Sequence, residues 1–245
     1  PESIMAAVCH FPTLENAVQT AQQVIQYGVP IARIEMLNKD QMGISINYSK
    51  LKDIQAVPTL FFEFHGSELS NNENIKIVEE ISKDNDGSSF KWAKDLEDRN
   101  KLWKARWDVY YSVKALIDNG RVYSTDVCVP ISNITECVNF AEEQANKFGL
   151  RAPMVGHLGD GNFHVILPFD PKKKEMYKKI REFNGLLIKK ALELNGTITG
   201  EHGVGLHKKE YLLEEHADSV PLMKLIKRSI DKNNIMNPGK IFDLN

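Results

Sequence analysis

The order of strand-like and helix-like segments before residue 96 constrains the fold of this chain more than any other feature. Short apolar runs bounded by turn residues predict strands at residues 4–11, 31–37, 59–65 and 89–93. Helical periodicity predicts helices at residues 16–27, with Thr13 as the expected N-cap, and at residues 74–83. The resulting β-α-β-β-α-β order is that of a ferredoxin-like unit, an antiparallel sheet with helices on one face.

The rest of the chain repeats this alternation, although no residue-level repeat accompanies it. The patterns predict a helix at 96–118, an extended segment at 123–130, a helix at 133–148, a strand, turn and strand within 153–169, and helices at 172–195 and 221–232. We therefore expect an α+β fold. Its ferredoxin-like repeats would span residues 1–200, and a C-terminal helical segment would occupy residues 201–245.

Composition limits the classes of partner. The chain has 245 residues, of which 42% are hydrophobic, enough for a sizeable core. Its 31 Lys and Arg against 33 Asp and Glu give a net charge of −2, with no long basic run. This balance argues against nucleic acids and anionic membranes, and the longest apolar runs are far shorter than the roughly 20 residues of a membrane span. We expect small molecules or proteins as partners.

Cysteine usage and the first residue bear on cellular context. Cys9, Cys128 and Cys137 are widely spaced and form no C-x-x-C pair, which favours a reduced compartment without a disulfide framework. The sequence opens with Pro1 at the edge of the first predicted strand. From this we expect that it begins inside a larger protein.

The segment from Gly156 to His164 carries the most informative pattern. Asp160-Gly161 is a favoured pair for a two-residue type I′ hairpin turn, which predicts that His157 lies directly across from His164. Directly opposed side chains project from the same sheet face with Cβ atoms about 4.5–5.5 Å apart, so the two imidazoles could share one metal ion. The alternative is a pair of packed or surface histidines, because a site needs a third ligand.

A candidate third ligand lies in the segment from Gly200 to Gly205. Glu201 and His202 are flanked there by glycines, which leave room for a substrate or cofactor to approach the backbone. Glu201 would complete a set of two histidines and one carboxylate, leaving His202 free as a base. The glycine order is not that of a dinucleotide fingerprint, and the alternative is a turn with an exposed Glu-His pair.

Arg106 stands among aromatic residues at helical spacing. Trp103, Trp107 and Tyr110 share its predicted helix, so an arginine walled by aromatic rings could bind a carboxylate in bidentate fashion. The alternative is a solvated arginine on a helix whose aromatic residues belong to the core.

Four blocks in this order resemble the C-terminal half of FAD-linked D-2-hydroxy-acid dehydrogenases, flavoenzymes of the vanillyl-alcohol-oxidase type. The blocks are residues 123–130, 156–164, 200–205 and 236–240. The resemblance implies FAD as cofactor and an N-terminal FAD-binding domain that is absent from this sequence. Residues 1–200 would then be the substrate (cap) domain, and residues 201–245 would pack on the FAD domain.

The same resemblance implies roles for individual residues. A divalent metal, zinc or manganese, would be bound by His157, His164 and Glu201, and His202 would be the catalytic base. Arg106 would hold the substrate carboxylate. The cofactor side of the site would be formed by Asn237, Glu201 and His202.

Two differences from the hydroxyglutarate-specific members of the family narrow the choice of substrate. Hydroxyglutarate-specific members carry an Asn two residues after the second metal histidine and a Lys near the strand at residues 124–125, whereas this chain has Ile166 and no Lys between residues 123 and 130. A small monocarboxylate is therefore favoured, and the resemblance implies oxidation of D-lactate to pyruvate. The block at 124–127 is most similar to mitochondrial D-lactate members, implying a mitochondrial location and an acceptor such as cytochrome c.

Two alternatives remain open at this point. Glycolate or D-2-hydroxyglutarate could be the substrate, since enzymes for both share the architecture. A different class is a standalone ferredoxin-like module that binds a metal or ligand and meets no flavin, because a fold alone does not define a function.

Overall fold

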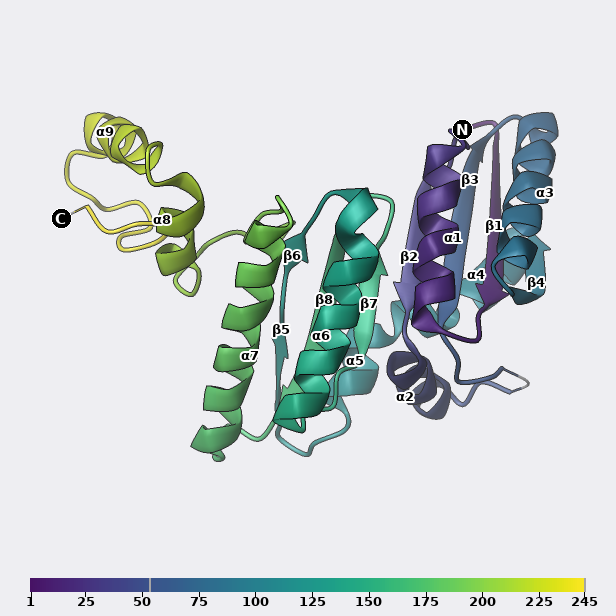
Figure 1. Ribbon diagram of the computed structural model, residues 1–245, viewed down its shortest axis with the longest axis horizontal. Coiled ribbons are helices and arrows are strands. Elements are labelled where there is room, and N and C mark those ends of the chain that lie inside the picture. Colours follow the sequence, from purple (N-terminus) through teal and green to yellow (C-terminus); the bar gives the residue numbers. More distant parts are fainter. Residues whose placement is uncertain (53, 245) are drawn as a thin grey trace.

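A computed structural model describes residues 1–52 and 54–244, and within them the strands form an eight-stranded antiparallel sheet (Figure 1). The strand order is β4-β1-β3-β2-β7-β8-β5, with β6 paired to β8. The first half of the chain contains β1 (Ser3–His10), α1 (Leu14–Gln26), β2 (Arg33–Leu37), α2 (Lys39–Ser49), β3 (Thr59–Gly66), α3 (Glu68–Asp84) and β4 (Ser88–Ala93). The second half contains α4 (Leu96–Trp107), α5 (Val109–Lys114), β5 (Arg121–Ser124), β6 (Val127–Cys128), η1 (Ile131–Asn133), α6 (Ile134–Phe148), β7 (Met154–His157), β8 (Asn162–Phe169), α7 (Lys174–Glu193), α8 (Lys209–His216) and α9 (Val220–Ile230).

The first four strands confirm the predicted ferredoxin-like unit. They pair in the order β4-β1-β3-β2, and α1 and α3 pack on one face of them. Helix α1 begins where the sequence predicts, because the Thr13 side chain accepts a hydrogen bond from the backbone N–H of Asn16 at 3.1 Å.

A second unit of the same design follows. Strands β7, β8 and β6 pair in that order, and an isolated bridge between Cys128 and Thr197 stands where the fourth strand of the unit is expected. The two units join through their edge strands, since β2 pairs with β7 and places Glu35 opposite His157. This seam brings residues far apart in sequence to one place.

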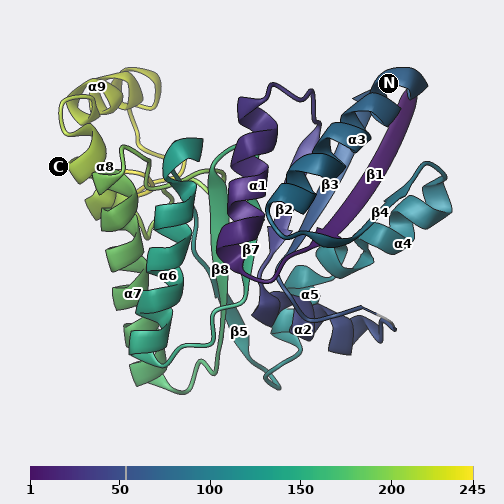
Figure 2. The same ribbon diagram turned by 45° about the vertical axis from the view of Figure 1, so that its right-hand side comes forward.

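Helices cover both faces of the sheet. Helices α1, α3, α6 and α7 pack on one face, while the shorter α2, α4 and α5 lie against the other (Figure 2). The α+β antiparallel class is confirmed, but the expectation of helices on one face covers only the first group. The apolar side chains of Ala6, Val8 and Phe61 lie on the opposite face of the sheet from α1 and α3. Because exposing them to water would be unfavourable, α2, α4 and α5 pack against that face.

Two helices differ from the sequence-based expectation. The predicted helix at 96–118 is divided at Asp108 into α4 and α5, and the Asp108 carboxylate accepts hydrogen bonds from Ser49 and Lys104. Helix α2 lies between the predicted strands at 31–37 and 59–65, where the patterns predict no helix. It begins at Asn38, whose side chain accepts from the backbone N–H of Gln41 at 3.0 Å, and tertiary burial of Met42 outweighs its weak amphipathic pattern.

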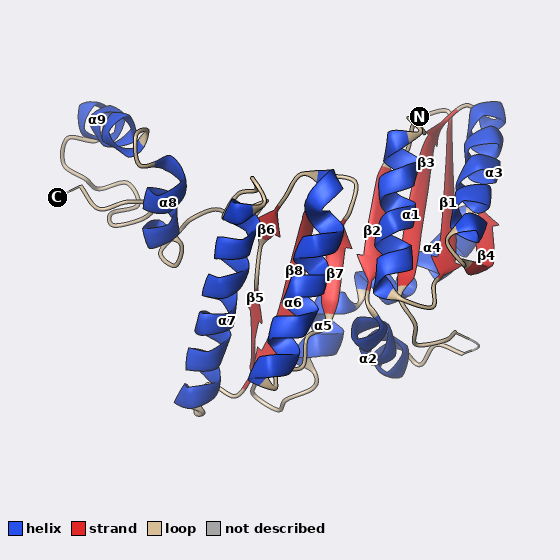
Figure 3. Cartoon of the chain, viewed as in Figure 1, coloured by secondary structure: helices blue, strands red, loops and turns tan. Residues whose placement is uncertain are grey.

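The C-terminal segment, α8, α9 and the loop after them, projects beyond α7 (Figure 3). Large apolar side chains of α9 are exposed along one side of the helix, namely Leu222, Leu225, Ile226 and Ile230. Val220 is the buried residue of this helix. Within residues 1–52 and 54–244, no helix is both long and apolar enough to cross a membrane.

Candidate metal and catalytic site

The candidate ligands lie on the sheet face that α4 and α5 share. Val155 in β7 and Ile166 in β8 belong to the apolar cluster beneath these helices. Side chains two residues apart on a strand point to the same face, so His157 and His164 continue this face beyond the helices.

The hairpin between β7 and β8 differs from the prediction in its register. Four residues, not two, separate the strands, and His157 lies opposite Asn162 while His164 lies opposite Val155. The predicted type I′ turn is therefore wrong. Because the shift in pairing is two residues rather than one, both histidines stay on one face, and their ring centroids are 5.6 Å apart.

The orientation of the His157 ring is fixed by a buried carboxylate. Its Nδ1 lies 2.8 Å from Oε1 of Glu35. An ionised carboxylate only accepts, so Nδ1 carries the hydrogen and the lone pair is left on Nε2. The hydrogen bond to Glu35 also raises the pKa of His157.

His164 is buried, and its two ring nitrogens have different surroundings. Its Nδ1 donates to the backbone carbonyl of Thr125 at 2.8 Å, which leaves the lone pair on Nε2. This Nε2 makes no hydrogen bond to any residue that the structure describes. Burial lowers the pKa of His164, which favours the neutral ring that a metal requires.

The Glu201 carboxylate lies beside the Nε2 atoms of both His157 and His164. Its Oε1 lies 3.0 Å from Nε2 of His164 and 3.7 Å from Nε2 of His157. Two ligand atoms at 2.0–2.1 Å from a tetrahedral zinc ion lie about 3.3 Å apart, so these separations suit a shared cation. Three electron-pair donors with no hydrogen between them fit a divalent metal such as zinc or manganese.

A buried aspartate holds the loop that carries Glu201. The carboxylate of Asp126 accepts hydrogen bonds from the backbone N–H groups of residues 200, 201 and 202 at 3.0–3.2 Å. It also pairs with the Lys208 ammonium at 3.1 Å. Burial alone would raise the pKa of Asp126, but the hydrogen bond from Thr199 and the charge of Lys208 hold it well below its usual range.

Glycine is required at one position of this loop. A Cβ atom at Gly200 would lie 2.0 Å from Nδ2 of Asn162, the amide that also donates to Asp126 at 3.0 Å. The loop is therefore pressed against β8, and Glu201 is carried toward His164.

His202 lies beside the ligands without being enclosed. Its ring stacks on that of His164, and its Nε2 is 3.5 Å from Oε1 of Glu201. The side chain is 43% exposed, so a substrate can reach it. This arrangement is compatible with a base next to a metal.

Arg106 is engaged by the carboxylate that orients His157. Its Nε and Nη2 each lie 2.9 Å from Oε2 of Glu35, and its side chain is 20% exposed. Among its aromatic neighbours, Trp103 belongs to the core, whereas Trp107 and Tyr110 are about half exposed. Arg106 is therefore paired with a protein carboxylate rather than solvated, and its binding of a substrate carboxylate stays a prediction.

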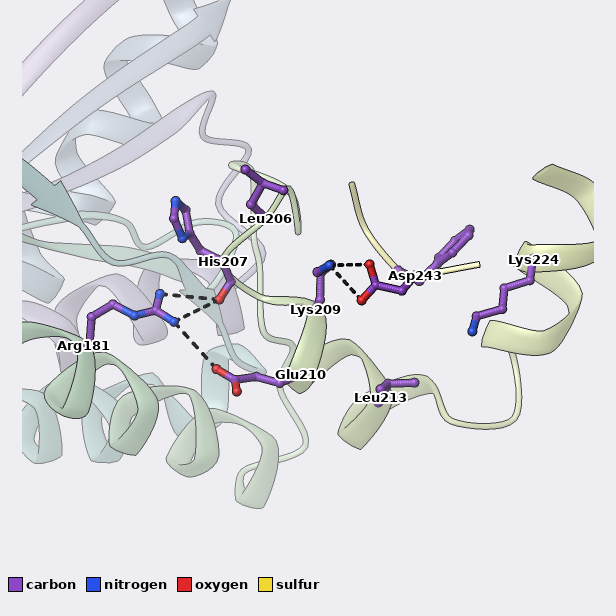
Figure 4. A pocket seen from close by; sticks show the side chains of 9 residues that line it. Arg181, Leu206, His207, Lys209, Glu210, Leu213, Lys224 and Asp243 are labelled. Carbon is purple, nitrogen blue, oxygen red and sulfur yellow. Dashed lines mark hydrogen bonds and ion pairs between the residues drawn. The ribbon is translucent and has the colours of Figure 1, made fainter. Parts of the chain in front are cut away.

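Asn237 is not brought to the histidine cluster. It lines a pocket of about 360 Å³ formed by residues after position 226. A different pocket of about 540 Å³ lies where α8 and the terminal loop meet α7 (Figure 4). Its charges are paired: Arg181 approaches Glu210 at 3.7 Å, and Lys209 binds Asp243 at 2.7 Å.

Sequence reasoning missed Glu35 and Asp126. Glu35 lies between Ile34 and Met36, and Asp126 directly precedes the apolar Val127, both in strand-like segments where an ionised group is rarely buried unless it is paired. That signal was present in the sequence. Their partners Arg106 and Lys208 lie 71 and 82 residues away, which pattern analysis could not connect.

The fold is shared with solved oxidases. A 4-ethylphenol oxidase from Gulosibacter chungangensis matches it with a TM-score of 0.73 at 13% sequence identity, over 99% of this chain and 55% of that chain. At this identity the likeness shows the fold alone. The fold of this chain thus corresponds to about half of that larger oxidase.

The chain belongs to the family of FAD linked oxidases, C-terminal domain, which matches residues 1–241. It is 43% identical over 245 residues to a protein of Danio rerio named probable D-lactate dehydrogenase, mitochondrial, and covers 49% of that protein. It is 36% identical over 242 residues to the mitochondrial D-lactate dehydrogenase (cytochrome) of Arabidopsis thaliana, of which it covers 42%. The chain therefore spans about half the length of the curated relatives it matches.

Proposed function

We propose that this chain is the substrate-binding part of an FAD- and metal-dependent D-2-hydroxy-acid dehydrogenase that oxidises D-lactate to pyruvate. The observation that carries the proposal is the buried Nε2 of His164, which makes no hydrogen bond within the described residues but lies 3.0 Å from Oε1 of Glu201, beside Nε2 of His157. The names of the relatives from Danio rerio and Arabidopsis thaliana support D-lactate as substrate.

In this proposal, separate residues bind the metal and accept the substrate proton. His157, His164 and Glu201 hold the divalent metal. When bound, the metal supplies a Lewis acid that lowers the pKa of the substrate hydroxyl, and FAD supplies the acceptor for the C2 hydride. His202 takes the hydroxyl proton on a ring nitrogen while the carbon–hydrogen bond at C2 breaks.

Arg106 holds the substrate carboxylate. Two of its guanidinium nitrogens already bind Glu35, so the carboxylate meets the guanidinium through Nη1. The apolar Ile166, two residues from His164 on the same face, provides no polar group for a second carboxylate. A monocarboxylate therefore fits better than a dicarboxylate.

The C-terminal segment packs on the FAD-binding domain. The exposed apolar side of α9, with Leu222, Leu225 and Ile226, has no cover within the described residues and suits burial against another domain. Asn237, in the loop after α9, then contacts the cofactor together with Glu201 and His202. By the same relatedness we propose a mitochondrial location and an acceptor such as cytochrome c.

The first test is metal content and D-lactate oxidation of the protein expressed from its full gene. We expect the His157→Ala variant to lose both metal and activity, and the His202→Ala variant to keep metal while losing turnover. Glycolate and D-2-hydroxyglutarate serve as comparison substrates. A wild type that holds FAD without stoichiometric metal would refute the metal assignment, and one that binds metal without FAD would favour the standalone module.

A further inference from the structure

Glu35 is a charged group placed where charge is costly. It lies in β2 between the core residues Ile34 and Met36, and its side chain is only 6% exposed. A buried carboxylate is stable only when it is paired and hydrogen-bonded. Burial would raise the pKa of Glu35, but the hydrogen bond from His157 and the charge of Arg106 more than offset this and lower it.

The two carboxylate oxygens of Glu35 have different partners. Oε1 accepts from Nδ1 of His157 at 2.8 Å, directly across the β2–β7 seam between the two ferredoxin-like units. Oε2 accepts from Nε and Nη2 of Arg106, each at 2.9 Å. One side chain thus links a residue of the ligand cluster to the arginine on α4.

We propose that Glu35 is a positioning residue that prepares both His157 for the metal and Arg106 for the substrate carboxylate. This inference rests on the function proposed above. By accepting from Nδ1, Glu35 holds the His157 tautomer whose lone pair is on Nε2, facing Glu201. By binding Nε and Nη2, it leaves Nη1 of Arg106 as the free edge of the guanidinium.

A Glu35→Gln substitution tests this because an amide cannot serve both partners. If the amide oxygen faces Arg106, the amide nitrogen donates to Nδ1 of His157, and the ring hydrogen moves to Nε2, where a metal cannot bind. If the oxygen faces His157, the amide hydrogens face the Arg106 donors and repel them. Either orientation disables one function.

The chain offers a matched control in Glu63. Its carboxylate also bridges an arginine and a histidine, accepting from Arg33 and His65 at 2.7 Å each, and its side chain is 12% exposed. It lies in β3, outside the ligand cluster. Glu63→Gln therefore reports the cost of losing such a bridge without touching the site.

The experiment titrates Zn²⁺ or Mn²⁺ against a competing chelator, with the protein expressed from its full gene. We expect Glu35→Gln to weaken metal binding about 10–100-fold, while Glu63→Gln stays near the wild type. Added metal should restore part of the turnover of Glu35→Gln, but its KM for D-lactate should stay raised because Arg106 is misplaced. If Glu35→Gln does not fold, Glu35→Asp keeps the charge and should also weaken metal binding, because its shorter side chain draws back from His157.

The outcomes separate the two proposals. Wild-type metal affinity and KM in a folded Glu35 variant would overturn the positioning role and leave the proposed function intact. A wild type that binds neither metal would overturn the proposed function itself. An equal loss in the Glu35 and Glu63 variants would reduce Glu35 to a structural bridge.

Discussion

The rings of His164 and His202 stack face to face, with centroids 4.7 Å apart and planes inclined by 13°. The ring of His164 belongs to the candidate ligand cluster and is buried, while the side chain of His202 is 43% exposed. The stack orients the His202 ring, and within the described residues no hydrogen bond to its ring nitrogens is found. Packing and proton transfer by His202 can therefore be separated by substitution.

A His202→Phe variant keeps an aromatic ring for the stack but removes the proton acceptor. We expect turnover of D-lactate to fall about 10²–10⁴-fold with metal content unchanged, which is the usual contribution of a positioned base. His164→Phe serves as the contrast, since it should lose metal and turnover together. Retained turnover in His202→Phe would assign the base to another residue.

Asp126 is predicted to dominate the stability of the loop at 200–202. Asp126→Asn leaves the buried Lys208 ammonium without its counter-charge and weakens three backbone hydrogen bonds. We expect a loss of about 3–5 kcal/mol in the free energy of unfolding, measured by urea denaturation. The exposed Asp98→Asn, which loses only its pairing with Lys101, should stay within about 0.5 kcal/mol of the wild type.

Gly200 and Gly203 form a matched pair for testing how the loop meets β8. Gly200→Ala places a Cβ 2.0 Å from Nδ2 of Asn162, so we expect the loop to shift and metal affinity to fall. Gly203→Ala meets no atom within 4 Å, but its φ of +76° should cost about 1–2 kcal/mol of stability. Equal metal affinity in the two variants would show that the contact with Asn162 does not place Glu201.

The pH dependence of the C-terminal loop should depend on Asp231. Its hydrogen bond from Lys227, with help from the backbone N–H of Met236, lowers its pKa to about 2. A lowered pKa means that its stabilisation is complete above the ordinary value of about 3.9 and disappears as the pH falls toward 2. The difference in Tm between the wild type and Asp231→Asn should therefore shrink from pH 5 to pH 2. A constant difference would contradict this.

Much of the fold could be predicted because local patterns dictate it. Thr13 caps α1 as the sequence predicts, and the β4-β1-β3-β2 order of the first unit is that of the predicted ferredoxin-like unit. Helix α2 was missed because its pattern is weak and tertiary burial of Met42 and Ile44 stabilises it. The break at Asp108 depends on Ser49, a partner that only the folded chain brings near.

At the site, the candidate ligands could be predicted from the sequence, but the buried acids that orient them could not. His157, His164 and Glu201 meet although the predicted hairpin register was wrong, because a shift of two residues preserves the face. The buried acids Glu35 and Asp126 act through partners on other elements, so no local spacing reveals them. The pairing of β2 with β7 places Glu35 beside His157, and Asp126 binds the loop at 200–202 through its backbone.

Metal removal should destabilise the protein through the same cluster. A ligand that binds only the folded state adds about 2.7 kcal/mol when present at 100 times its Kd, so a chelator should lower the Tm of the metal-loaded wild type. The effect should vanish in His164→Ala, because the buried Nε2 that faces Glu201 at 3.0 Å is gone. His216→Ala, at the exposed end of α8, is the control and should respond to the chelator like the wild type. If the chelator leaves the wild-type Tm unchanged while metal is released, the three donors do not couple metal binding to folding.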